Sequence, residues 1–150
     1  MAYTLQAILS QSATLDRASI QGTRVVLLRS GVSMLPLGTA FLEAHAAPFL
    51  PLTDAGDGTL PPTIASVCSR LAECGEVAYV EAELHGGEGI QAAVVFRQGG
   101  SQDPPRVASD AINVALRALG VRPPAGVDEF SAVGLGAHRE TDQWLSAAGA

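Results

Sequence analysis

Four side chains that could do chemistry alternate in the segment 77–97, VAYVEAELHGGEGIQAAVVFR. Successive residues of a strand point to opposite faces, so Tyr79, Glu81, Glu83 and His85 are predicted to share one face. We call these four residues the polar row. Residues at i and i+2 lie about 6.5–7 Å apart, close enough for two carboxylates and an imidazole to converge on a metal ion or a water. Paired carboxylates can also divide into a general acid and a general base.

The same alternation has a simpler interpretation. An antiparallel sheet with one solvated face places polar residues at alternate positions without giving them a chemical task. Glu88 in the glycine-rich turn 86–89, and Gln91 or Arg97 in the second strand of the hairpin, are expected to complete a polar patch around the row. The row therefore predicts either a recognition surface or a catalytic site.

A second group of ionisable residues is expected to open the last helix. His138 and Asp142 are four residues apart with Arg139 beside them, so the imidazole and the carboxylate can touch on one helical face. Such a carboxylate would orient the imidazole ring and raise its basicity. The alternative is an ordinary solvated helix flank. If the fold brings His138 near Glu81 or Glu83, the catalytic interpretation gains support.

Composition excludes several function classes. All nine basic residues are arginine, so chemistry that needs a P-loop lysine, a Schiff-base lysine or a Ser-Lys dyad is ruled out. The formal charge of −6 and the scattered arginines argue against a nucleic-acid partner. No apolar run reaches the roughly 18 residues of a membrane span, and the first residues carry no basic targeting region. We expect a soluble, cytoplasmic protein with no membrane partner.

Metal and cofactor motifs are incomplete, so no cofactor or metal is expected. The segment 54–58, DAGDG, lacks the ligand spacing of a calcium loop. The glycine pair of 134–136 lacks the third glycine of a dinucleotide turn, because Arg139 stands in its place. Cys68 and Cys74 are expected in one helix, about 9 Å apart along its axis, which is too far for a disulfide.

The elements around these groups predict a single α+β domain over residues 1–150. Its antiparallel sheet is expected to contain a central β-hairpin and to carry three or more packed helices. Strands are predicted at 2–9, 24–29 and 34–37 in addition to the hairpin, and helices near 39–46, 64–72, 108–119, 128–133 and 137–148.

Parts of the chain resemble a family of small bacterial proteins of uncharacterised activity. The matching phrases are YVEAE with GGEGIQ in the hairpin, and DEF with AVGLG, HR, Thr141 and Trp144 near the C-terminus. The family carries an aromatic residue where this chain has His85, so the resemblance gives His85 no family-wide role. It implies no activity and supports only the choice of segments.

Three functions remain open. The first is a non-enzymatic module that binds a protein partner through an acidic sheet face, for example an immunity- or antitoxin-like neutraliser, with Tyr79, Glu81, Glu83, His85, Glu88, Gln91 and Arg139 as candidate binding residues. The second is a small acid–base or metal-dependent hydrolase that uses Glu81, Glu83 and His138 as catalytic residues. The third is a small-ligand-binding protein. A homodimer is compatible with each of them.

Overall fold

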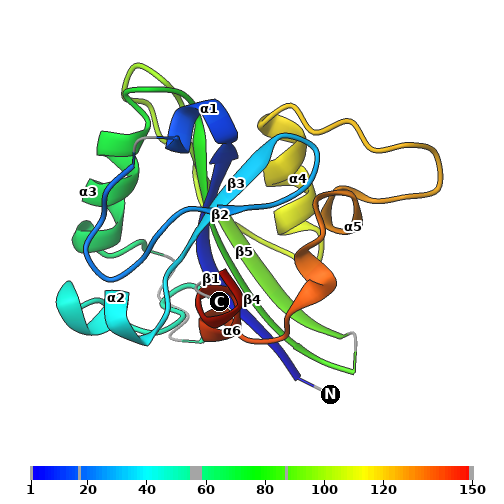
Figure 1. Cartoon of the computed structure of the whole chain (residues 1–150), viewed down its shortest axis with the longest axis horizontal. Helices are drawn as coiled ribbons and strands as arrows, with labels where there is room; N and C mark the ends of the chain where they lie inside the picture. The colour runs from blue at the N-terminus through cyan, green and yellow to red at the C-terminus, as the bar shows by residue number, and fades with distance from the viewer. Residues whose placement is uncertain (1, 17, 55–58, 87, 149–150) are drawn as a thin grey trace.

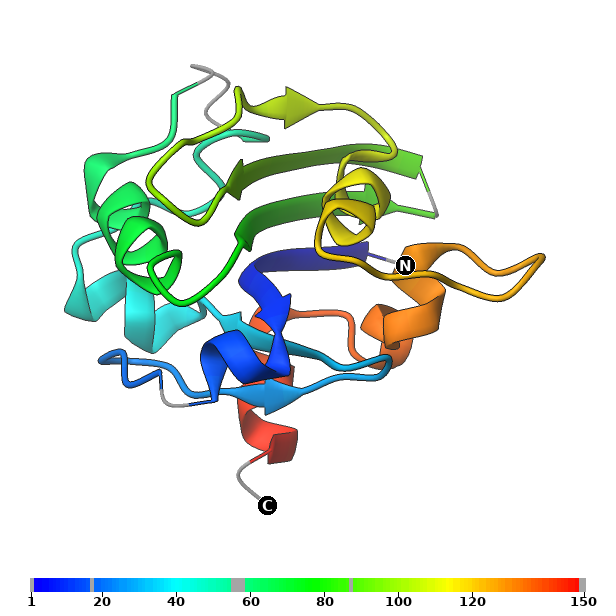
Figure 2. The ribbon, with the colours of Figure 1, turned by 90° about the horizontal axis from the view of Figure 1, so that it is seen from above.

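A six-stranded antiparallel sheet forms the centre of the protein in the computed structural model, which describes residues 2–16, 18–54, 59–86 and 88–148. The α+β prediction is confirmed. The strand order is β2-β3-β1-β4-β5-β6, as Figure 2 shows from above. The strands are β1 (Ala2–Gln11), β2 (Val26–Leu27), β3 (Val32–Pro36), β4 (Val77–His85), β5 (Glu88–Phe96) and β6 (Arg106–Val107).

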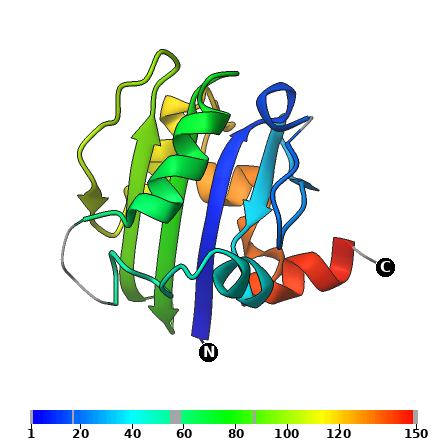
Figure 3. The same ribbon diagram turned by 90° about the vertical axis from the view of Figure 1, so that its left-hand side faces the viewer.

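Helices cover both faces of this sheet (Figures 1 and 3). Helices α2 and α3 lie on one face, which we call the α3 face, and α4 and α5 lie on the other, the α4 face. The helices are α1 (Ser12–Leu15), α2 (Thr39–Ala44), α3 (Pro62–Leu71), α4 (Ala111–Ala118), α5 (Glu129–Val133), the 3₁₀ turn η1 (Leu135–Ala137) and α6 (Thr141–Ala148).

Alternation along β1 explains how one strand serves two cores. Tyr3, Leu5 and Leu9 are buried on the α4 face, whereas Ile8 is buried on the α3 face. β1 pairs with β4 over residues 2–10 and with β3 over residues 7–11, so it forms the middle of the sheet. The predicted apolar side of the first strand is therefore confirmed, but the sheet has no wholly wet face.

The β2 segment departs most from expectation. The run 24–29 is predicted to be a buried strand, yet only Val26–Leu27 pair with β3, and Leu27 is 75% exposed. β2 is an edge strand, so one side of its backbone has no neighbouring strand in the sheet. Pro36 ends β3, in keeping with its missing N–H.

Of the two C-terminal helices, α5 opens at Asp128 as predicted, whereas α6 begins later than the sequence pattern indicates. Asp128 caps α5, because its carboxylate accepts the Ser131 N–H at 2.9 Å, and Gly134 ends that helix in the left-handed conformation. α6 begins at Thr141, so His138 and Arg139 both lie before it, His138 in extended backbone. Among the residues described here, no helix is both long and apolar enough to cross a membrane.

Candidate functional site

The polar row does share one face of β4, but that face is covered along half of the row. Tyr79 and Glu81 are completely buried, Glu83 is half-buried and His85 is exposed. The expectation of a solvated row is therefore wrong for Tyr79 and Glu81. The loop that precedes α3 lies over these two side chains and separates the row into an interior half and an open half.

Glu81 holds that loop through its carboxylate. The backbone N–H of Leu52 donates to it at 3.1 Å, the N–H of Thr53 at 2.8 Å and the Thr53 hydroxyl at 3.0 Å. Burying a carboxylate is costly unless several donors compensate it, and here backbone donors do so. Glu81 thus acts as an anchor for the loop.

Tyr79 and Gln6 extend the same interior network. The Tyr79 hydroxyl donates to Glu81 at 2.5 Å and accepts from Gln6 Nε2 at 3.0 Å. The Gln6 amide also bonds the loop backbone: its Nε2 donates to the Pro48 carbonyl at 3.2 Å, and its Oε1 accepts the Leu50 N–H at 3.2 Å. Burial, followed by the negative charge of Glu81, raises the pKa of Tyr79 well above its ordinary value.

The geometry of this network is unsuited to acid–base catalysis. Both Glu81 oxygens already accept hydrogen bonds, and one of their donors is the Tyr79 hydroxyl. Within the described ranges, no three His, Cys, Asp or Glu side chains are grouped so that they could hold a metal ion.

His138 lies away from Glu81. Its ring packs edge-on against Trp144, with ring centroids 4.6 Å apart, and Trp144 belongs to the core of the α4 face. Glu81 pairs in register with Gln6 and Ala92 and points to the α3 face. The predicted partner of His138 is also engaged elsewhere, because the Asp142 carboxylate accepts the Thr39 N–H at 3.0 Å and the Thr39 hydroxyl at 2.7 Å.

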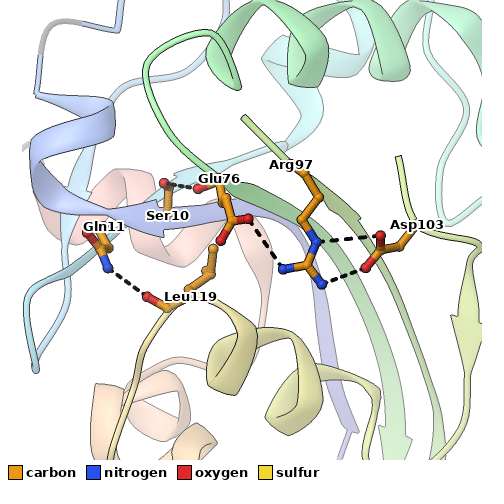
Figure 4. A network of polar contacts seen from close by, with 6 residues as sticks. All are labelled: Ser10, Gln11, Glu76, Arg97, Asp103 and Leu119. Carbon is orange, nitrogen blue, oxygen red and sulfur yellow. Dashed lines mark hydrogen bonds and ion pairs between the residues drawn. The ribbon is translucent and has the colours of Figure 1, made fainter. Parts of the chain in front are cut away.

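Gln91 and Arg97 do not join the polar patch. Gln91 pairs with Ala82 and so points to the α4 face, where its Oε1 accepts the Ile112 N–H at 3.0 Å. Arg97 follows β5 at the opposite end of the hairpin and bridges Glu76 at 3.3 Å and Asp103 at 2.8 Å (Figure 4). Both predictions are wrong because the strand pairing decides which face and which end a side chain occupies.

The open half of the row forms a surface at the turn end of the hairpin. Thr4, Glu83 and Ile90 are in register across β1, β4 and β5, and His85 is paired with Glu88 one step nearer the turn. All five lie on the α3 face, beyond the loop that covers Glu81. We call Thr4, Glu83, His85, Glu88 and Ile90 the hairpin-end surface.

Two further residues border this surface. Phe49 is 53% exposed and lines, together with Thr4, a small cavity of about 220 Å³. Arg139, a predicted binding residue, lies at the free edge of β1, where its carbonyl accepts the Thr4 N–H at 2.8 Å. The border therefore adds the ring of Phe49 to a surface whose own charges are carboxylates, and it places the Arg139 backbone beside Thr4.

Sequence reasoning missed Gln6, Thr4, Phe49 and Ile90. Gln6 carried a signal, since a glutamine between apolar residues of a central strand needs hydrogen-bond partners when buried. Phe49 and the loop around it gave none, because their position depends on the tertiary bonds to Gln6 and Glu81.

Comparisons with known proteins add no functional information for this fold and site. No protein-family model, no curated protein and no solved structure matches the chain. The resemblance to a bacterial family stays a prediction.

Proposed function

We propose that the protein is a non-enzymatic module that binds a protein partner through the hairpin-end surface. The single observation that carries this proposal is the division of the polar row: Glu81 is used by the fold, whereas Glu83 and Glu88 remain available at its surface. An immunity- or antitoxin-like neutraliser in the cytoplasm is one form of such a module.

The chemistry of the surface favours a basic partner with an apolar contact. Glu83, His85 and Glu88 lie in two adjacent rows with the apolar Ile90, which is 37% exposed, and the half-exposed ring of Phe49 lies at the border. Exposed aromatic and aliphatic groups rimmed by charge are typical of protein contacts. The net charge of −6 would steer a basic partner toward the protein.

The hydrolase hypothesis loses its support in this geometry. It requires Glu81, Glu83 and His138 to converge, but Glu81 is saturated with donors and His138 packs beside Trp144 on the α4 face. Binding of a protein partner requires only that the Glu83 and Glu88 carboxylates be accessible.

Charge reversal at the surface tests the proposal. The variant E83R/E88R is compared with E43R/E73R, which changes the formal charge equally at two exposed positions on α2 and after α3. Each protein is immobilised, exposed to lysate of the source organism, and its captured proteins are quantified by mass spectrometry. The affinity of the candidate is then measured with purified components.

The expected result is one protein captured by the wild type and by E43R/E73R, with binding to E83R/E88R weakened about tenfold or more. Equal binding to both variants would contradict the proposal, as would loss of binding to both. Sedimentation of all three proteins shows whether the partner is a second copy of the chain.

A further inference from the structure

A second surface feature lies on the opposite face of the sheet, between the edge strand β2 and the helices α5 and α6. It is a cavity of about 490 Å³, and its walls are mainly apolar. Leu28, Phe130, Val133 and Trp144 contribute to these walls, and Arg29 is the one ionisable residue among those lining the cavity. Cavities of this size and character are typical of sites for small molecules.

Arg29 lines this cavity, and no carboxylate in the described part of the chain forms an ion pair with it. Its backbone N–H donates to the Val133 carbonyl at 3.1 Å, and its side chain runs past Gly134, where an added Cβ would lie 3.7 Å from Arg29 Cδ. Its side chain is exposed, and Arg70 on α3 is likewise unpaired among the described residues, whereas Arg97, Arg106 and Arg117 each have a carboxylate partner. The C-terminal end of α5 lies beside Arg29 and favours a cation at this position.

Trp144 supplies a second, independent observation. The residue is only 6% exposed, and its Nε1 is the one buried side-chain nitrogen or oxygen in the described part of the chain that has no hydrogen-bond partner. Native proteins rarely leave such a donor unpaired, because the lost hydrogen bonds to water are not replaced. A donor without an acceptor and a guanidinium without a counter-ion thus belong to two residues that line one apolar cavity.

We propose that this cavity binds a small carboxylate with an apolar body, either aromatic or branched aliphatic. The carboxylate pairs with the Arg29 guanidinium, which matches its planar geometry. The apolar body contacts Phe130, Leu28 and the Trp144 ring. This site is independent of the hairpin-end surface.

The single tryptophan makes the site directly observable. The test titrates the whole protein with 3-phenylpropionate and, in parallel, with 3-phenylpropanol, which has the same body without the charge. Binding is followed by the fluorescence of Trp144 and by the ¹H–¹⁵N signal of its indole N–H. The variants are R29Q and the control R70Q, which removes an exposed arginine on α3, across the sheet from the cavity.

The expected result is saturable binding of the acid, with the alcohol weaker by about fivefold or more. R29Q should remove this preference while R70Q keeps it, and the acid should move the indole N–H signal. Equal affinity for acid and alcohol would overturn the proposal. So would an unchanged preference in R29Q, or no response to either compound at about 10 mM, a weak limit for molecules of this size.

Discussion

Tyr79 and Glu81 point the same way from β4 and are joined by a hydrogen bond of 2.5 Å in the interior of the protein. This buried pair shows that the first half of the polar row has a structural role. Glu81, one of the three predicted catalytic residues, instead fixes the loop at Leu52 and Thr53. The residues that follow the pair in the same row, Glu83 and His85, face the surface and remain available to a partner.

The stability of the protein should fall at alkaline pH. Burial raises the pKa of Tyr79 and of Tyr3 above the ordinary value of 10.0, so above that pH the folded state retains protons that the unfolded chain loses. Stability is therefore complete below pH 10 and declines above it, by up to about 1.4 kcal/mol per pH unit for each tyrosine.

Urea denaturation at a series of alkaline pH values measures this decline. Because these two tyrosines are the only ones in the chain, phenolate absorbance should appear together with the loss of circular dichroism. Ionisation of either tyrosine well before unfolding would show that its hydroxyl is open to solvent.

Gly89 should be intolerant of alanine. A Cβ at this position would lie 2.1 Å from the Glu83 carbonyl oxygen, and the residue has a φ of +152° that disfavours a side chain. We expect G89A to lower the free energy of unfolding by about 2 kcal/mol or more. The control is G136A, because nothing lies within 4 Å of its added Cβ and its φ is not positive.

Thermal denaturation of both glycine variants provides the comparison. A stable G89A would mean that the hairpin register at Glu83 and Leu84 can shift. In that case the paired rows that define the hairpin-end surface would not be fixed.

The acid limb of the stability curve should depend on Arg117. A hydrogen bond of 3.1 Å from the Arg117 guanidinium lowers the pKa of Glu129 below its ordinary value of 4.5. A lowered carboxyl pKa stabilises the fold at pH values above 4.5, and this contribution disappears as the pH falls through the folded pKa.

R117Q should therefore lose stability near neutral pH and show a flatter decline below pH 4.5 than the wild type. R70Q, which removes an exposed arginine from α3, should keep the wild-type curve. Parallel acid limbs for R117Q and the wild type would exclude the pair as the cause.

The features of the fold and the site that depend on contacts between residues close in sequence could be predicted. The faces of β1 and β4 depend on local alternation, so the burial of Leu5 and the common direction of Tyr79 and Glu81 were predictable. The α5 cap at Asp128 was also a local signal.

The parts that could not be predicted depend on contacts between distant segments. Glu81 meets Thr53 across 28 residues, and Asp142 meets Thr39 across 103 residues. The spacing of His138 and Asp142 does not reveal that the Asp142 carboxylate accepts hydrogen bonds from Thr39 instead. The register of β5 against β4 likewise decides that Gln91 faces α4, because it pairs Gln91 with Ala82.

The central claim is that Glu81 belongs to the interior and Glu83 to the surface, and alanine substitution tests it most directly. E81A leaves the Leu52 and Thr53 N–H groups and the Tyr79 hydroxyl without their acceptor, so its free energy of unfolding in urea should fall by about 2–4 kcal/mol. E83A should stay within about 0.5 kcal/mol of the wild type. If E81A is too unstable to purify, E81Q should show a smaller loss of about 1–2 kcal/mol. Equal losses at the two positions, or a wild-type stability for E81A or E81Q, would contradict the division of the row.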